Sequence, residues 1–193
     1  DVRPKVLGYG QYTDDLYLDG MVHASAVRSR HPRARVVSID PSEALALPGV
    51  LAVLTAEDVP HNKVGHIQQD WDVMIAVGDV TRCVGDALCL VIAETEDILK
   101  QAKELVRIEY EPLPPVRTIQ EAMAEDAPKV HSGGNLCQQR HVTRGDAKTA
   151  LANSKYTVTR SYQTPWTEHA FLEPECAVAF PHGDGVKVYT SDQ

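Results

Sequence analysis

The densest group of side chains able to do chemistry lies near the C-terminal end of the 193-residue chain. Glu168 and His169 are adjacent, and Glu173 and Glu175 follow shortly after them among apolar and aromatic residues. Carboxylates and an imidazole crowded in this way can shift one another's pKa values and mark a functional site. A structural alternative stays open, in which His169 and Glu173 form a buried hydrogen-bonded pair that fixes a loop between two strands.

Other motifs that carry chemistry are incomplete. None of the eight histidines pairs with another at the four-residue spacing of a zinc-binding helix, and His61 and His66 lie in a polar stretch without further ligands. Gly8 with Gly10, and the pair at 133–134, lack the third glycine and the following helix of a dinucleotide-binding turn. We therefore assign no catalytic and no metal-ligating residue within this chain.

The cysteines favour structural thiols over a cluster. No two of them have the spacing of a C-x-x-C pair, and an iron-sulfur cluster held within this chain would need all four. Three of the four lie in apolar sequence surroundings, which predicts buried, reduced thiols. The four residues are Cys83, Cys89, Cys137 and Cys176.

Charge and hydropathy exclude several classes of partner. Nineteen basic and 27 acidic residues give a formal net charge of -8, with no run of basic residues that would bind nucleic acid or a membrane surface. The longest apolar stretches, such as 87–93, are too short to span a bilayer, and the N-terminal residues lack the apolar region of a signal peptide. We expect a cytoplasmic protein with no nucleic-acid and no membrane partner.

Strands and helices alternate through the first 115 residues. Thr95 caps the clearest helix, whose apolar residues recur at the three-to-four spacing of one buried face. The sequence predicts that the strand 80–84 pairs with the strand 87–93 through the turn at Gly85 and Asp86, and that 61–72 is a surface loop. Further strands are expected at 22–28, 34–39, 50–54 and 107–110, with a short helix at 41–46.

The remaining chain begins with a linker. Proline-rich residues 112–115 stop the last strand, Thr118 starts a short helix, and 127–141 has the composition of a loop. Asp146 caps another helix that runs to about residue 153. Strands are expected at 156–163, 176–180 and 186–190, so the whole chain is predicted to be an α+β protein.

Residues 162–175 carry a resemblance to a known family. They read Tyr-Gln-Thr-Pro-Trp-Thr-Glu-His-Ala-Phe-Leu-Glu-Pro-Glu, and this resembles the segment of the molybdenum hydroxylases (xanthine dehydrogenase and aldehyde oxidoreductase) in which an acid-histidine pair precedes Leu-Glu-Pro. Matches to the same family's large molybdopterin-binding subunit occur in order along the chain. They lie at 5–15, 20–24, 28–29, 31–36, 48–50, 55–60, 83–86, 108–114 and 145–146.

The resemblance implies an architecture and an activity. It implies an α/β-hammerhead domain over 1–115, a linker with a short helix over 116–144, and the truncated start of a molybdopterin-binding domain over 145–193. The complete enzymes hydroxylate a carbon of an N-heterocycle or an aldehyde with oxygen from water, using the molybdenum cofactor (molybdopterin). They pass electrons to iron-sulfur clusters and usually FAD on partner domains or subunits, and the assembled enzyme is expected to be a dimer.

One departure from the family pattern concerns the expected cofactor contact. Many members have glutamine immediately before the acid-histidine pair, whereas this chain has Thr167, whose hydroxyl is shorter and donates one hydrogen bond directly or through water. Thr167 and Glu168 are the residues we expect beside the cofactor, while His169 and Glu173 shape the loop. Among subgroups we prefer the selenium-dependent purine hydroxylases.

Two hypotheses of function follow. In the first, the chain is the N-terminal portion of a molybdopterin-dependent hydroxylase that acts on a small molecule, either a purine or related N-heterocycle or an aldehyde. The family's glycine-rich cofactor motif and its base glutamate lie downstream of residue 193, so the chain is expected to be a fragment that is inactive alone. In the second, it is a free-standing hammerhead-type interaction module whose loop 61–72 docks a partner protein.

Overall fold

The computed structural model describes residues 2–191, which divide into two units. The larger unit comprises residues 22–142, and the smaller unit comprises residues 2–21 together with 143–191. The larger unit contains β1 (His23–Arg28), β2 (Ala34–Asp40), α2 (Ser42–Leu45), β3 (Val50–Leu54), η2 (Ala56–Asp58), β4 (Lys63–Val64), β5 (Trp71–Asp72), β6 (Ala87–Ala93), α3 (Glu96–Leu105), β7 (Arg107–Pro112) and α4 (Ile119–Ala122). The smaller unit contains α1 (Val2–Val6), η1 (Thr13–Asp15), α5 (Ala147–Ala152), β8 (Ala177–His182) and β9 (Gly185–Thr190).

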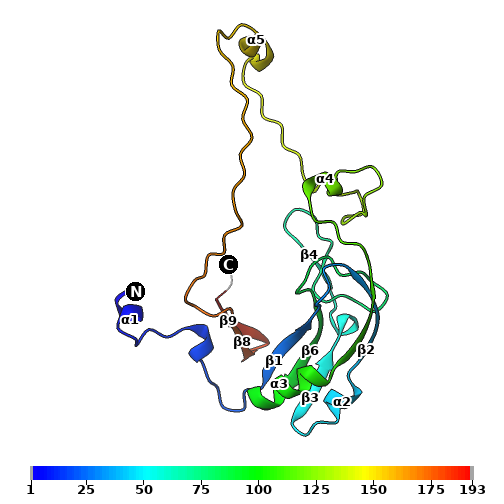
Figure 1. Ribbon diagram of the computed structural model, residues 1–193. Coiled ribbons are helices and arrows are strands. Elements are labelled where there is room, and N and C mark those ends of the chain that lie inside the picture. The colour runs from blue at the N-terminus through cyan, green and yellow to red at the C-terminus, as the bar shows by residue number, and fades with distance from the viewer. Residues whose placement is uncertain (1, 192–193) are drawn as a thin grey trace. The chain divides into compact units, whose positions relative to one another are not determined.

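The core of the larger unit lies on both sides of β6. This strand is the centre of an antiparallel sheet of order β1-β6-β3, and α3 packs against that sheet (Figure 1). Successive side chains of a strand point to opposite faces. Cys89 and Val91 accordingly join the apolar cluster formed with α3, whereas Leu88 joins a second cluster with Val36 and Ile75. The continuous apolar run of β6 therefore reflects burial on both faces.

The helix α3 confirms the clearest prediction from the sequence. The Thr95 hydroxyl oxygen accepts a hydrogen bond from the Ile98 backbone N–H at 3.3 Å, which caps the first turn. Leu99 and Ala102 are buried against the sheet. The spacing of the apolar residues thus correctly predicted which face of α3 is buried.

The β2–β7 pair confirms two further predicted strands, whereas the predicted loop 61–72 contains an unpredicted hairpin. Within it, β4 and β5 pair antiparallel. The Asn62 side chain clamps the base of this hairpin, because its amide donates to the Met74 carbonyl at 2.8 Å and accepts from the Met74 N–H at 2.9 Å. The Asn62 side chain thus makes two hydrogen bonds that a longer strand would make through its backbone. Hydrophobic periodicity does not reveal such side-chain hydrogen bonds.

The predicted hairpin between 80–84 and 87–93 is wrong. Among the described residues, β6 pairs with β1 and β3, and within 80–84 only Val80 makes a bridge, to Arg35. The buried Asp86 carboxylate accepts from the Arg82 N–H at 2.6 Å and from the Cys83 N–H at 3.2 Å. These bonds satisfy backbone donors that a strand would have offered to a neighbour, so the segment closes as a turn.

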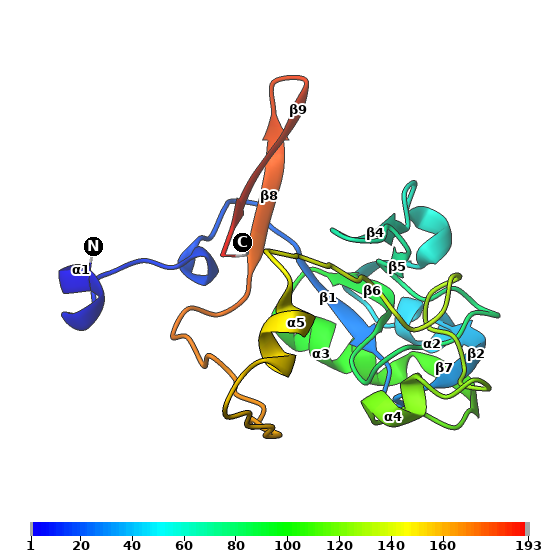
Figure 2. The same cartoon turned by 90° about the horizontal axis from the view of Figure 1, so that it is seen from above.

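In the smaller unit, the predicted β8–β9 hairpin is confirmed and is drawn as a twisted two-stranded ribbon in Figure 2. Its turn uses Gly183 at φ +61°, a left-handed conformation that favours glycine. The helix α5 is capped as predicted, with Asp146 accepting from the Thr149 N–H at 3.0 Å. The strand predicted at 156–163 is absent from the described structure, because no neighbouring segment there pairs with its backbone.

Candidate functional site

Thr167 and Glu168 lie on a long extended segment between α5 and β8. Residues 156–171 have no regular secondary structure, and Figure 1 draws this part of the smaller unit as an extended run. Both side chains are exposed. Within residues 2–191, the hydroxyl of Thr167 makes no hydrogen bond, so it is available to a group that approaches this segment.

The backbone immediately after these two residues is constrained. The His169 N–H donates to Glu168 Oε1 at 3.0 Å. Ala170 has φ 49°, and it is the only non-glycine residue of the described chain with a positive φ. A left-handed alanine costs free energy, and such residues concentrate at sites that bind or react. This feature singles out the same motif, although no sequence pattern predicts a positive φ at alanine.

The proposed structural pair of His169 and Glu173 is a prediction that the structure corrects. His169 is exposed and Glu173 is half-buried, and no hydrogen bond joins their side chains in the described region. Ser191 anchors this part of the chain instead, because its hydroxyl donates to the Pro174 carbonyl and accepts from the Cys176 N–H, each at 3.0 Å. The anchor comes from the end of β9, which is too distant in sequence for motif spacing to reveal.

Large apolar side chains are exposed along the same segment. Trp166 is fully exposed and Tyr162 is nine-tenths exposed. Tyr156, Val158, Phe171 and Leu172 are also exposed. A gathering of this kind on one stretch of chain is typical of a surface that another protein segment covers.

The cysteines are all free thiols, as predicted, but only Cys89 is buried. Burial raises its pKa to about 11. Cys83 and Cys137 are exposed and Cys176 is half-buried, so the expectation of three buried thiols is wrong. Cys83 lies in the turn closed by Asp86. Within residues 2–191, no group of three or more His, Cys, Asp or Glu side chains is placed to hold a metal ion.

The loop 61–72 contacts a later part of its own chain. His131 Nδ1 lies 2.7 Å from Asp70 Oδ2, and the Gln68 side-chain amide donates to the Cys137 carbonyl at 3.0 Å. The hydrogen bond with His131 is the main cause that lowers the pKa of Asp70 below its ordinary value. His61 and His66 of this loop are exposed. The loop thus orients the segment 130–137, a role that polar composition alone did not indicate.

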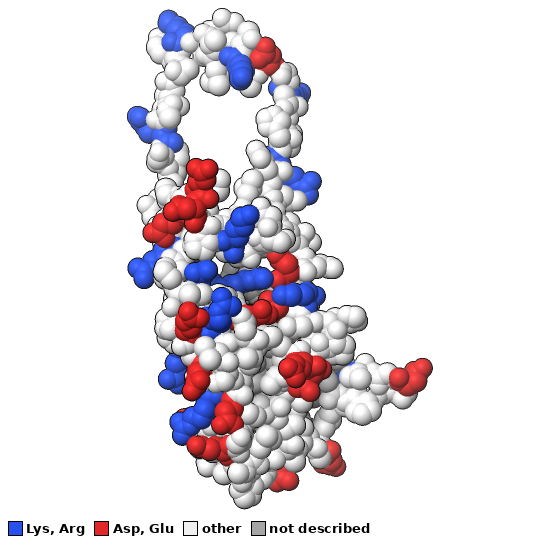
Figure 3. Space-filling model, turned by 90° about the vertical axis from the view of Figure 1, so that its right-hand side faces the viewer, with Lys and Arg blue, Asp and Glu red and all other residues white. Residues whose placement is uncertain are grey.

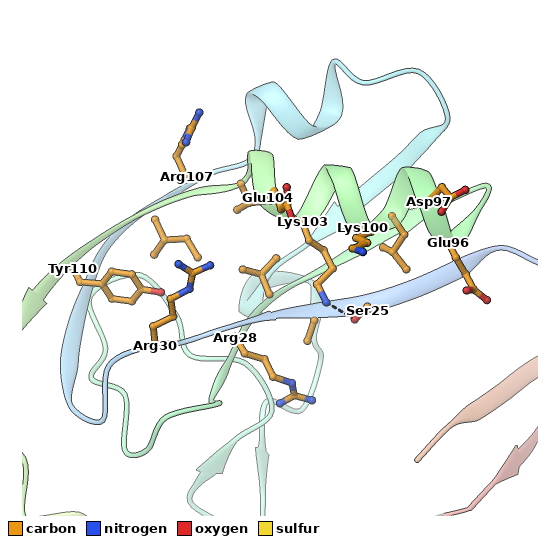
Figure 4. Close-up of a pocket in the computed structure, with 15 residues that line it drawn as sticks. Ser25, Arg28, Arg30, Glu96, Asp97, Lys100, Lys103, Glu104, Arg107 and Tyr110 are labelled. Carbon is orange, nitrogen blue, oxygen red and sulfur yellow. Dashed lines mark hydrogen bonds between the residues drawn. The ribbon is translucent and has the colours of Figure 1, made fainter. Parts of the chain in front are cut away.

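One cavity, of about 1100 Å³, is lined mainly by residues of β1, α3 and β7 (Figure 4). It contains neither Thr167 nor Glu168. Two of its charged groups are already paired, since Lys103 Nζ donates to Ser25 Oγ at 2.8 Å and Arg107 Nη2 lies 3.1 Å from Glu43 Oε2.

Among residues 2–191, none of the helices combines the length and the apolar character that a membrane-spanning helix needs.

Comparison with known families defines the class of the protein. Residues 7–114 match the model of the aldehyde oxidase and xanthine dehydrogenase a/b hammerhead domain, and residues 130–193 match the molybdopterin cofactor-binding domain. The chain belongs to the aldehyde oxidase and xanthine dehydrogenase family. The α+β fold, with its hammerhead domain, is therefore confirmed, and the second match supports molybdopterin as the cofactor.

Individual proteins that the chain resembles belong to the same class of molybdenum enzymes. The chain is 36% identical to a xanthine dehydrogenase molybdenum-binding subunit of Escherichia coli O157:H7, over all of this chain and 27% of that protein. It is 35% identical to the nicotinate dehydrogenase large molybdopterin subunit of Eubacterium barkeri, over 96% of this chain and 44% of that protein. The solved aldehyde oxidoreductase of Desulfovibrio gigas is 27% identical with a TM-score of 0.80, over 97% of this chain and 22% of that chain. The chain thus spans less than half the length of these relatives.

Proposed function

We propose that this chain supplies the hammerhead domain and the first part of the cofactor-binding domain of a molybdopterin-dependent hydroxylase. This oxidoreductase acts on a purine or related N-heterocycle, or on an aldehyde, and takes its oxygen from water. The observation that carries the proposal is that both domain models match one chain in order, over 7–114 and 130–193. A free-standing interaction module accounts for the first match alone, and we do not favour it.

Thr167 and Glu168 are the residues that we propose would lie beside the cofactor. Their exposed hydroxyl and carboxylate fit a polar group that offers both acceptors and donors. Thr167 would donate one hydrogen bond, and Glu168 would accept with the oxygen that His169 does not occupy. When bound, the cofactor supplies the redox metal centre, while these side chains and the constrained backbone at Ala170 orient it.

The exposed apolar side chains of 156–172 indicate that another protein segment covers this part of the chain. We propose that the remainder of the molybdopterin-binding subunit covers them, and that iron-sulfur and FAD-containing domains or subunits accept the electrons. The assembled enzyme is proposed to be a dimer in the cytoplasm. The selenium-dependent branch stays a prediction, as does the three-part division at residues 115 and 144.

The proposal is tested first on the 193-residue chain alone. We expect no turnover of hypoxanthine or of an aldehyde, because this chain spans less than half the length of the relatives it matches. Turnover above the buffer rate would contradict the expectation. In parallel, the parent gene is sequenced beyond the codon for Gln193. A reading frame that continues into a glycine-rich Gly-Gly-Phe-Gly-Gly stretch supports the hydroxylase, and a stop codon there supports the interaction module.

A second test uses the complete subunit, loaded with cofactor. Thr167→Ala should lower kcat by about tenfold to a hundredfold, because an outer hydrogen bond to the metal centre is lost, while the molybdenum content stays near that of the unmodified protein. Thr159→Ala is the matched control, since Thr159 is an exposed threonine of the same extended segment. Equal kcat values for both variants would remove Thr167 from the cofactor site.

A further inference from the structure

A second cavity, of about 550 Å³, lies wholly within the larger unit. Three stretches of chain that are distant in sequence build its walls. They are the start of β2 with the residues before it, the turn at 78–84, and the proline-rich segment that includes 115–116 and 128–130. The hairpin β4–β5 contributes Lys63 and Asp72. The cavity belongs to no site assigned above.

Positive charge dominates this cavity. Its cationic side chains are Arg33, Arg35, Lys63, Arg82 and Lys129, and its carboxylates are Asp72 and Asp79. Asp72 is only 8% exposed and is already engaged by Lys63 and by Arg82, whose Nη2 lies 3.6 Å from Asp72 Oδ2. Figure 3 shows a band rich in Lys and Arg on one face of the molecule, bordered by Asp and Glu. The five cationic and two acidic lining residues give the cavity a local excess of positive charge in a chain whose net charge is -8.

The arginines are held in place with donors to spare. Arg33 Nη1 donates to the Pro114 carbonyl at 3.1 Å, and Arg35 Nη1 donates to the Gly78 carbonyl at 2.7 Å. Arg35 Nε also lies 3.4 Å from Glu111 Oε2. A guanidinium carries five N–H donors, so these contacts hold each side chain without using all of its donors. Preorganised guanidinium groups lose little conformational entropy when they bind an anion.

Arg82 provides the decisive observation. Its Nη1 is the one buried side-chain nitrogen or oxygen in residues 2–191 that has no hydrogen-bond partner. A buried donor on a charged group is costly when unpaired, so the Arg82 guanidinium, which lines the cavity, gains free energy if it turns this donor toward an acceptor there. The larger cavity of Figure 4 has no such unsatisfied group among its described lining residues, although it also contains basic side chains.

We propose that this cavity binds a phosphate-type oxyanion, held by Arg82 and Lys129. Planar guanidinium groups match the oxygens of phosphate in geometry and charge. A small rotation of the Arg82 guanidinium turns the buried Nη1 toward the cavity, where a charge-assisted hydrogen bond to the anion satisfies this donor. Lys129 is exposed and comes from the proline-rich segment, whereas Arg82 comes from the turn before β6. The anion therefore also ties that segment to the hammerhead domain. This site is independent of the hydroxylase activity proposed above.

The test is titration calorimetry of the 193-residue chain with inorganic phosphate and, separately, with glycerol 3-phosphate, at an ionic strength held constant with chloride. Binding of either probe supports the site. Binding of the ester alone identifies its ligand as the phosphoryl group of a larger molecule. The Trp71 ring lies 5.4 Å from the Arg82 guanidinium, so its fluorescence, recorded in a Trp166→Phe background, should change with the same dissociation constant and thereby locate the ligand.

Variants make the proposal falsifiable even if one of them folds poorly. Arg82→Gln and Lys129→Ala should each raise the dissociation constant about tenfold, because each removes a charge-assisted contact. Lys129 is exposed, so its replacement leaves the fold intact, and circular dichroism checks both variants. Lys100→Ala removes an exposed cation of α3 outside this cavity and should bind like the unmodified chain. No binding of either probe, or equal binding by Lys129→Ala and Lys100→Ala, would overturn the proposal.

Discussion

At the scale of single residues, Asp86 shows how one side chain redirects the backbone. It is 7% exposed, and its carboxylate accepts from two backbone N–H groups and from the Cys83 thiol. The thiol is affected in turn, because partial burial raises the pKa of Cys83 to about 11 and the hydrogen bond to Asp86 adds to the effect. The turn before β6 therefore depends on this carboxylate.

Replacing Asp86 by alanine tests that dependence. Asp86→Ala should lower the free energy of unfolding by about 2 kcal/mol, because two part-buried backbone N–H groups lose the acceptor that closes the turn. Urea unfolding followed by circular dichroism measures the change. Asp79→Ala is the control, since this exposed aspartate should change stability by no more than about 0.5 kcal/mol. Equal losses in the two variants would show that the turn does not rely on Asp86.

Asp70 supplies a pH-dependent prediction at the same scale. Its hydrogen bond with His131 lowers its pKa below the ordinary 3.8. A carboxyl with a lowered folded pKa stabilises the folded state above pH 3.8, and this contribution disappears as the pH falls through the lowered value. NMR of the carboxyl carbon should show a titration midpoint below 3.8 that moves up toward it in His131→Ala.

Asp146 serves as the internal reference for that titration. Its pKa is also lowered, by the hydrogen bonds with Thr149, which do not involve His131. Its midpoint should be the same in the variant and in the unmodified chain. An unchanged midpoint of Asp70 would mean that the contact with His131 does not hold in solution.

At the scale of elements, α3 and β6 together form the core of the hammerhead domain. Leu99 and Ala102 of α3 pack with Cys89, Val91 and Ala93 of β6. We expect Leu99→Ala to lower the free energy of unfolding by about 2–5 kcal/mol, because the cavity left behind collapses only in part. Thr95→Ala, which removes the cap, should cost about 1 kcal/mol.

The neighbouring Lys100 provides the matched control for α3. Its side chain is exposed, so Lys100→Ala should change stability by no more than about 0.5 kcal/mol. Chemical denaturation of Leu99→Ala, Thr95→Ala and Lys100→Ala measures how much free energy of unfolding each variant loses. A loss in Lys100→Ala as large as in Leu99→Ala would contradict the assignment of the buried face.

At the scale of the whole molecule, the two units differ in how they bury apolar surface. Among residues 2–191, the buried apolar side chains all belong to 22–142, apart from Val178. The smaller unit leaves Tyr162, Trp166 and Leu172 exposed on a segment without regular secondary structure. We therefore expect the hammerhead domain to be stable and the extended segment to depend on the cover proposed above.

Limited proteolysis tests this contrast. Chymotrypsin should cleave first after Tyr162, Trp166 and Phe171, because their backbone is unpaired and their side chains are accessible. Mass spectrometry should then find a persistent product that retains 22–142. Tyr110 is the control, since it is half-buried in β7 and paired to β2. Early cleavage at Tyr110 would refute the expected order.

Local rules predicted much of the fold. The cap at Thr95 with its apolar spacing, the cap at Asp146 and the β8–β9 hairpin were predicted because each depends on residues within a few positions of one another. The ordered motifs also predicted the family, since they span nearly the whole chain. The position of Thr167 and Glu168 beside a cofactor stays a prediction.

Contacts between distant residues were decided only by the tertiary structure. The partners of β6 are β1 and β3 rather than its sequence neighbour, because the buried Asp86 closes the intervening chain into a turn. Ser191 rather than His169 anchors the chain before β8. Periodicity and capping in the sequence were enough to predict local elements such as α3, with its buried face, and the β8–β9 hairpin. Pairing, the left-handed Ala170 and the unsatisfied Arg82 arise from long-range packing, which a local pattern does not encode.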